Sequence, residues 1–487
     1  MEITAENIPK LLKKKIFTRQ NVAEIIEITP TAGSYNDTEE VAPRRQRLLK
    51  ITQDQFLKEL DPNSHDINNP AIYPNKVKKD DKGNSTVTYV ARVSIALQRF
   101  IANRQAIHQL ANPVILSKGR KDEEEVFLDF KEFWRFSGID NKMLEVLKSA
   151  KSTGDGAVYF FFDDDKELNF KCWSYKDGDV LIPRYKSDGA TLKSFTHRYF
   201  SVDEEGKEVD TVEVYDDTNR YLFVQNEKNE WENIDVKPHG FGVVPVAYHR
   251  EDDVAWACVQ DLIDKLERSL SDYRDSNAYF TYGMLFLKGQ TIDVLPDKDT
   301  QGKVIISEDS ESDAKLLEQN NVAKGFEFEF TNYLKTIYYH TGTVVIDPED
   351  FKGGDVTGAA VRNYYDPAIQ QALMTEPDLQ GFIKQVISIM KVSFGIAEGK
   401  TLAMKNFKIK ADLDIYVPRN ISEEVTLINQ SVTMGSLSAR TASERNKFSK
   451  SDEYERILLE FKNKKDETES SIGNDGDKKV TPTKKDE

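Results

Sequence analysis

The sequence predicts a multidomain protein of the α+β class. The chain has 487 residues, whereas a single hydrophobic core rarely grows beyond roughly 250–300 residues. Hydrophobic residues make up 39% of the chain and aromatic residues 10%, which is enough to build several cores. Segments with apolar residues at helical spacing flank residues 170–248, where the apolar period approaches two. We therefore expect helices and antiparallel strands in separate parts of the chain.

The N-terminal part of the chain is expected to contribute little to a core. Residues 1–60 contain one short helical pattern within mostly polar sequence and predict an arm. Asn, Asp, Pro and Lys dominate residues 61–84, which predict a long surface loop. An amphipathic helix is predicted from Val90, and it should end before Asn112-Pro113 because proline disfavours continuation of a helix.

Two further helices and a sheet are expected next. Residues 127–150 have helical spacing with a break at Ser137-Gly138, and Gly154 then leads into the strand-like run AVYFFF. Farther on, the runs DVLIPRY, TLKSFTHRYF, TVEVYD and YLFVQN are separated by acidic or glycine-containing turns. Such runs predict antiparallel strands joined by hairpins.

The longest helix is predicted from Val254 to about residue 280. Its apolar residues form a narrow stripe: Val254, Cys258, Leu262, Leu266, Leu270 and Tyr273. Charged residues cover the remaining circumference, so this helix should meet a neighbour along one seam. The later segment FEFEFTNYLKTIYYHTG carries Leu334 and Ile337 at helical spacing, although FEFEF alone alternates like a strand.

The C-terminal third is expected to be mainly helical. A loop at residues 344–357 should precede a helical region at 359–392, in which Pro367 and Pro377 predict kinks or breaks. FKIKADLDIYVPRN alternates and predicts one more strand, and ISEEVTLINQSVTMGSLSARTASERNKF predicts two helices separated near Gly435 and Ser438. Residues 463–487 contain almost no hydrophobic side chains and predict a disordered tail.

Composition excludes several classes of protein. The net charge of −16 argues against a conventional nucleic-acid binder, which clusters Lys and Arg to neutralise phosphates. No apolar run approaches the roughly 18 residues of a membrane helix, and the N-terminus lacks a secretory pattern, so we expect the protein to stay inside the cell. Cys172 and Cys258 have neither zinc-site nor disulfide spacing and are expected to be reduced.

The usual signatures of catalysis are missing from the sequence. It has no phosphate-binding loop, dinucleotide fingerprint, HExxH or GxSxG motif, and the six histidines lack metal-ligand spacing. Asp163-Asp164-Asp165 could supply nuclease-type metal ligands, but a solvated turn is the simpler interpretation. We therefore expect no catalytic residue, no metal and no cofactor.

Two other polar groupings leave a functional alternative open. The acidic residues between 347 and 355 could bind calcium, but their spacing differs from that of a calcium loop and favours a flexible acidic loop. Tyr333, Lys335, Tyr338 and Arg362 could stack on single-stranded bases. Core packing and subunit contacts explain such residues more simply.

The order of segments resembles that of the portal proteins of tailed double-stranded DNA bacteriophages, of the siphophage head-tail connector type. Gly154-Asp155-Gly156 leading into AVYFFFDDD resembles the family's glycine and strand, and FGVVPVAYHRED before DLIDKLERSLSDYRDSNAYF resembles its strand and long helix. IDPEDFKGGDVTGAAVRNYY resembles its tunnel-loop segment, with Thr357-Gly358 for Ser-Gly and Arg362 for the usual lysine. PRNISEEVTLINQSVTMGSLSARTA resembles the segment that opens the family's crown.

The resemblance implies a portal fold with an α/β wing, a two-helix stem, a small α/β clip and a helical crown. The implied order is an N-terminal arm at 1–60, the first part of the wing at 61–252, the first stem helix at 253–280, the clip at 281–321, the second stem helix at 322–343, the tunnel loop at 344–357, the second part of the wing at 358–418, the crown at 419–462 and the tail at 463–487. The expected tunnel-loop residues are Asp347, Glu349, Asp350, Phe351, Lys352 and Asp355. The expected stem-packing residues are Leu262, Leu266, Leu270, Tyr273, Leu334 and Ile337.

The same resemblance implies the partners. Family members form a ring, usually a dodecamer, at the portal vertex of the virion capsid, after assembly in the host cytoplasm. Double-stranded DNA passes through the ring during packaging and ejection. The terminase large subunit, a head-completion or adaptor protein, and the major capsid and scaffolding proteins are the expected protein partners, and no membrane is involved.

An acidic chain suits a channel for DNA, because each phosphate neutralised by a fixed cation adds affinity that translocation must overcome. Two alternatives have different signatures. A metal-dependent nucleic-acid-processing enzyme would lose activity on changes at the acidic clusters. A non-catalytic cytosolic scaffold would be monomeric or dimeric and would not respond to DNA.

Overall fold

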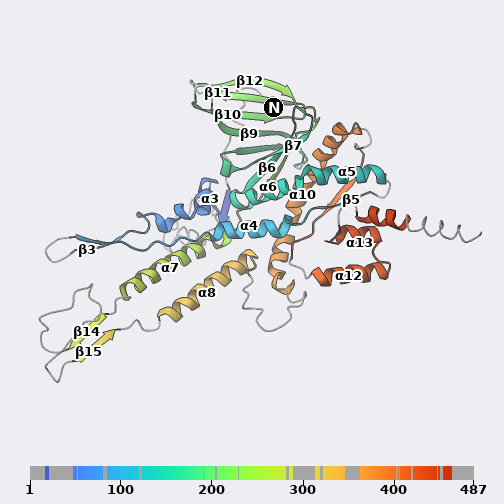
Figure 1. Cartoon of the computed structure of the whole chain (residues 1–487). Coiled ribbons are helices and arrows are strands. Elements are labelled where there is room, and N and C mark those ends of the chain that lie inside the picture. The colour runs from blue at the N-terminus through green and yellow to red at the C-terminus, as the bar shows by residue number, and fades with distance from the viewer. Residues whose placement is uncertain are drawn as a thin grey trace, which may run out of the picture. The chain divides into compact units, whose positions relative to one another are not determined.

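The computed structural model describes residues 17–20, 48–51, 53–79, 85–119, 123–189, 191–202, 206–226, 228, 230–280, 284–288, 313–317, 322–345, 362–401, 404, 406–417, 421–446, 448–449 and 453–462 (Figure 1). The chain divides into two compact units. The larger unit comprises Met1–Val345 and Asp366–Tyr416, and the smaller comprises Ile346–Tyr365 and Val417–Glu487. Both helices and strands are present in quantity, so the predicted α+β class is confirmed.

The larger unit begins with short elements. Strand β1 (Phe17–Gln20) pairs antiparallel with β2 (Leu48–Ile51), helix α3 (Gln53–Leu60) follows, and two 3₁₀ turns precede the hairpin of β3 (Lys76–Lys79) and β4 (Ser85–Thr88). The prediction that 61–84 is a loop is therefore wrong in part, because a short hairpin with few apolar residues gives a weak signal. Residues 53–60 also depart from the expected arm, since Phe56 and Leu60 are buried.

Helix α4 (Leu97–Leu110) begins seven residues later than the predicted start at Val90. Residues 89–96 form neither a helix nor a strand, and this stretch contains the β-branched residues Val90, Val93 and Ile95, which disfavour a helix slightly. Apolar spacing did not separate this run from the helix that follows it. The predicted end is confirmed, because α4 stops just before Asn112-Pro113.

The next two helices and the strand after them are as predicted. Helix α5 (Glu124–Ser137) ends at Gly138, α6 (Ile139–Thr153) ends at Gly154, and β6 (Asp155–Phe162) follows. Gly138 and Gly154 have φ angles of 71° and 90°, a left-handed conformation that favours glycine at the end of a helix.

Two antiparallel sheets follow in the sequence. The five-stranded sheet has the order β12-β11-β10-β9-β8, with bounds Trp231–Pro238, Asn219–Gln225, Glu208–Tyr215, Leu192–Val202 and Val180–Tyr185. The three-stranded sheet has the order β13-β6-β7, in which β13 is Val246–Arg250 and β7 is Leu168–Trp173. All four predicted hairpin strands are confirmed. Strand β7 was not predicted. The largely exposed edge strand β12 was not predicted either, because its sequence WENIDVKP has few apolar residues.

Two helices follow these sheets in the chain. After a 3₁₀ turn (Ala257–Val259), α7 runs over Gln260–Phe280, so it starts later than Val254. Strands β14 (Met284–Lys288) and β15 (Asp313–Leu317) form a hairpin between α7 and α8 (Val322–Thr341). FEFEF lies within α8, which excludes the strand interpretation.

Helix α10 (Asp366–Ala397) is one continuous helix. Pro367 is its second residue, where a missing N–H costs nothing, and Pro377 lies inside without ending it. The predicted final strand is shorter than expected: β16 covers Ile409–Asp412 and pairs with β5 (Ile115–Lys118). A large core joins α5, α6, β6 and α10, in which Phe130, Met143, Phe160 and Phe394 are completely or almost completely buried.

The described part of the smaller unit is helical. Helix α12 (Ile421–Thr433) and α13 (Ala439–Arg445) are separated near Gly435 and Ser438, as predicted. Gly435 has φ 70°, and the Ser438 hydroxyl caps α13 by accepting a hydrogen bond from the Thr441 N–H at 3.2 Å. Residues 453–462 form a further helix.

Candidate functional site: the α7–α8 helix pair

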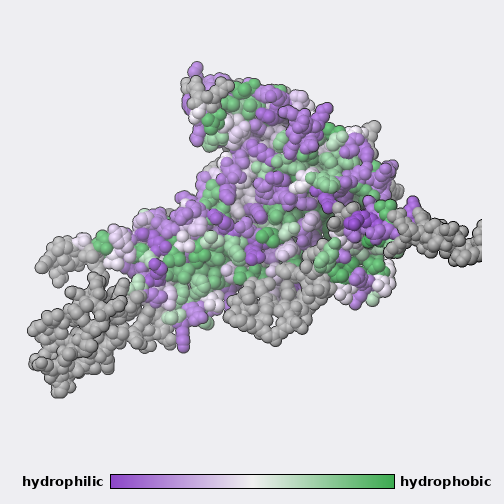
Figure 2. Space-filling model, viewed as in Figure 1, coloured by the Kyte–Doolittle hydropathy of each residue, from purple (hydrophilic) through white to green (hydrophobic). Residues whose placement is uncertain are grey.

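Helices α7 and α8 lie side by side and antiparallel (Figure 1). Near the end of α7 and the start of α8, the rings of Tyr273 and Phe326 stack at 4.0 Å with an interplanar angle of 3°. At the opposite end, Ile263 and Ile337 share one buried cluster. In Figure 2 apolar residues gather over this part of the molecule. The pair is therefore held by a continuous apolar seam.

The expected stem-packing residues all lie at or beside this seam. Leu266 and Ile337 are fully buried, Leu262, Leu270 and Leu334 are half-buried against the same cluster, and Tyr273 makes the ring stack described above. The expected stripe was shifted at one end, because Cys258 is exposed while Val259 and Ile263 are buried. Residues 259, 263, 266, 270 and 273 follow the 3.6-residue period more closely than a stripe through residue 258.

A second face of α7 binds residues 91–95. The backbone N–H groups of Ala91, Val93 and Ile95 donate to side chains one helical turn apart. The acceptors are Asp275 Oδ1 at 2.8 Å, Ser271 Oγ at 3.0 Å and Glu267 Oε1 at 2.7 Å. This contact between α7 and residues 91–95 was not predicted. The sequence does contain a pattern that could have indicated it, because the three acceptor residues occur at positions i, i+4 and i+8 and therefore share one face of the helix.

Glu267 is only 1% exposed and is the centre of this contact. Its Oε1 also lies 2.7 Å from Nδ1 of the buried His65, whose Nε2 lies 2.8 Å from the Glu59 carbonyl oxygen. Burial by itself lowers the pKa of His65, but the hydrogen bond and negative charge of Glu267 outweigh it, so the His65 pKa is raised. A buried ion pair thus fixes residues 59–65 to α7.

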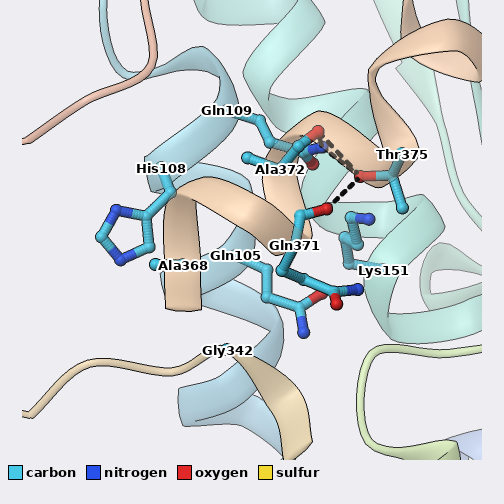
Figure 3. Close-up of a pocket in the computed structure, with 9 residues that line it drawn as sticks. All are labelled: Gln105, His108, Gln109, Lys151, Gly342, Ala368, Gln371, Ala372 and Thr375. Carbon is cyan, nitrogen blue, oxygen red and sulfur yellow. Dashed lines mark hydrogen bonds between the residues drawn. The ribbon is translucent and has the colours of Figure 1, made fainter. Parts of the chain in front are cut away.

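The base of the helix pair is held by α4. Three buried glutamines of α4 donate to three different elements. Gln98 Nε2 donates to Gln260 Oε1 of α7 at 3.2 Å, and Gln105 Nε2 donates to the Thr341 carbonyl of α8 at 2.8 Å. Gln109 Nε2 donates to the Ala372 carbonyl and to Thr375 Oγ1 of α10 (Figure 3).

The chain leaves α8 through Gly342, which lines a small pocket against α4, α6 and α10 (Figure 3). Gly342 has φ 59°, and a Cβ there would lie 2.8 Å from Gln371 Cβ and 2.9 Å from the Pro367 carbonyl oxygen. The end of α8 therefore packs directly on the first turns of α10. These two elements flank residues 346–361, which lie outside the described residues.

A buried ionic cluster lies near the same base. Lys151 Nζ of α6 and His249 Nε2 lie 2.9 and 3.0 Å from Glu251 Oε1. Burial by itself raises the pKa of Glu251, but the hydrogen bond from His249 and the charge of Lys151 outweigh it and lower the pKa to about 2. Glu251 is therefore ionised in the folded chain.

The remaining candidate residues fall into three groups. Asp347, Glu349, Asp350, Phe351, Lys352 and Asp355 lie outside the described residues. Asp163 organises a turn by accepting from the Glu167 N–H at 2.8 Å and from Asn169 Nδ2 at 2.6 Å. Tyr333 is half-buried beside the α7–α8 cluster, which fits the packing interpretation better than base stacking.

No group of His, Cys, Asp and Glu suited to holding a metal ion occurs within the described ranges. No helix among those the structure describes is long and apolar enough to span a membrane.

Comparison with known proteins identifies the family. Residues 50–467 match the family model described as "Phage portal protein, SPP1 Gp6-like". No curated protein matches the chain. Solved structures give 95 matching chains, one of which is described as "Neck of empty GTA particle computed with C6 symmetry". That match has 13% identity, covers 74% of this chain and 88% of the other, and has a TM-score of 0.36.

The family match extends over most of the chain and includes α3, both sheets, the α7–α8 pair, α10 and α12. The resemblance expected from the order of sequence segments is therefore confirmed, and the chain belongs to the SPP1 Gp6-like family of phage portal proteins.

Proposed function

We propose that this portal protein forms a closed ring at one vertex of a phage capsid and that double-stranded DNA passes through the ring during packaging and ejection. The observation that carries the proposal is the family match over residues 50–467. Ring closure needs two different complementary surfaces on each subunit, because each copy meets its neighbour head to tail. The net charge of −16 also supports the proposal, because an acidic protein binds DNA weakly and should let it pass through the ring.

Within this ring, α7 and α8 form the stem, β14 and β15 belong to the clip, and the sheets with α4, α5, α6 and α10 form the wing. Helices α12 and α13 belong to the crown. The support is the apolar seam between α7 and α8 and the hydrogen bonds from α4 that anchor their base. A pair anchored at one end and joined by a hairpin at the other suits a stem that connects wing to clip.

The loop after α8 is proposed to be the tunnel loop that contacts DNA. The packing of Gly342 on Pro367 and Gln371 supports this role, since it gives the loop fixed ends. Replacing Phe351 and Lys352 with alanine should lower the amount of DNA packaged while rings still assemble. Loss of rings in this variant would assign the loop a structural role instead.

The proposed partners are those of a portal vertex. The clip would bind the terminase large subunit during packaging and a head-completion or adaptor protein afterwards, while the outer surface of the ring meets major capsid and scaffolding proteins. A dodecamer is the proposed assembly, and the role is structural, without catalysis or a cofactor.

Electron microscopy of the purified full-length protein tests the proposal. We expect rings with a central hole, and capsids assembled without the protein should fail to fill with DNA. A monodisperse monomer, together with capsids that fill in its absence, would refute the function.

A further inference from the structure

We infer that neighbouring subunits contact one another through the outward faces of α7 and α8, in one specific register. This inference rests on the proposed ring. It concerns residues that point away from the seam between the two helices and that the larger unit does not bury.

The outward face of α7 carries four exposed charged residues, Asp261, Lys265, Arg268 and Asp272, and three of them have a spacing that α8 matches. Asp261, Arg268 and Asp272 lie opposite Ile263 on the helix, at spacings of seven and four residues. Arg268 lies over the Tyr73 ring at 5.6 Å, and Asp272 Oδ1 accepts a hydrogen bond from the Tyr73 hydroxyl at 2.6 Å. Tyr73 thus holds two of the three side chains in place while leaving them exposed.

The outward face of α8 has the matching pattern in reverse order. Lys335, Phe328 and Lys324 are all exposed, lie opposite Ile337, and are also separated by seven and four residues. Phe328 is 73% exposed, a high value for a phenylalanine on a folded helix. Within the part of the chain that the structure describes, no ion pair involves either lysine or Asp261.

Antiparallel alignment of these two faces gives three complementary contacts. Asp261 meets Lys335, Arg268 meets the ring of Phe328, and Asp272 meets Lys324. The outer pairs are opposite charges, and the central pair is a cation over an aromatic ring. Each face lies opposite the residue by which its helix enters the shared cluster, so each subunit can offer its α7 to one neighbour and its α8 to the other, as a closed ring requires.

Disulfide crosslinking tests the register. The full-length chain should carry Cys258→Ser to remove the exposed thiol, whereas Cys172 can stay because burial raises its pKa to about 12. In this background, Arg268→Cys with Phe328→Cys should give, on oxidation, a ladder of covalent multimers reaching the full ring. Each single variant should give none above a dimer.

The matched control is Asp272→Cys with Lys335→Cys. It uses the same two exposed faces but places the cysteines about 16 Å out of register along the helices, so it should give no ladder. Rings visible by electron microscopy, with no ladder from Arg268→Cys/Phe328→Cys, would overturn this inference and leave the proposed function standing. If the unsubstituted chain forms no ring, the proposed function itself fails.

A charge exchange gives an independent readout. Asp261→Lys or Lys335→Asp alone should raise the concentration needed for half-assembly by roughly 2–5-fold, and the double variant should restore it. If the single variants instead change DNA retention and leave assembly unaltered, these faces contact DNA, and the inference is wrong.

Discussion

At the scale of single residues, two buried carboxylates form ion pairs inside the fold. Glu267 is the first, because it accepts both from His65 and from the Ile95 N–H. The raised pKa of His65 means that this pair stabilises the folded chain fully below the ordinary histidine pKa of 6.5, and that the contribution is lost as pH rises through the higher folded value. The urea concentration at the unfolding midpoint should therefore decrease as the pH rises above 6.5. The His65→Gln variant should lose this dependence of the midpoint on pH. If the dependence is unchanged in the variant, other titrating groups cause it.

Glu251 is the second. Glu251→Gln should lower the free energy of unfolding by about 3–5 kcal/mol, because Lys151 is left as a buried charge without its carboxylate. In the unaltered chain, ionised Glu251 stabilises the fold fully above the ordinary glutamate pKa of 4.5. This stabilisation is lost as the pH falls towards the lowered pKa of about 2. Glu145→Gln is the control: its pair with Lys142 is exposed, so about 0–1 kcal/mol is expected. Equal losses in urea unfolding would contradict the argument.

At the scale of elements, the junction of α8 with α10 depends on a single glycine. Gly342→Ala should lower the free energy of unfolding by about 1–3 kcal/mol, because its Cβ meets the Pro367 carbonyl and φ is positive. Gly325→Ala in α8 meets nothing within 4 Å and should stabilise the helix by about 0.5–1 kcal/mol. Urea unfolding of both variants measures the difference. If Gly342→Ala leaves the free energy of unfolding unchanged, the residues around the junction move to accommodate the new Cβ.

The same elements show what the sequence could and could not predict. Apolar periodicity located α5, α6 and the hairpin strands, and it located α7 and α8 to within several residues. It failed for residues 89–96, which are rich in apolar residues but form no helix, because backbone N–H groups of this run donate to side chains of α7. It also failed for β12, an exposed edge strand. Local patterns therefore predict elements whose burial is regular, and they miss those fixed by a distant partner.

At the scale of the whole molecule, the family could be inferred from segment order, while the anchoring of the helix pair could not. The contacts of Gln98, Gln105 and Gln109 join α4 to residues far away in the chain. A glutamine on a helix carries no local signal that it will be buried. The packing residues of the pair were predictable because they repeat along one face, whereas the polar residues that hold its base act singly.

The acidic character of the molecule leads to a prediction about DNA. Isolated rings should retain double-stranded DNA weakly in filter binding at physiological salt, because the 83 acidic residues outnumber the 67 Lys and Arg and the net charge of −16 repels phosphates. Changing Asp347, Glu349, Asp350 and Asp355 to their amides removes four negative charges from the proposed tunnel loop. This variant should still form rings but should retain DNA more strongly and package it more slowly. The matched control changes Asp216, Asp217 and Glu230, beside the five-stranded sheet, and Glu232, within its edge strand β12, to amides. Equal gains in retention from both variants would mean that net charge alone, and not the position of the loop, governs the contact with DNA.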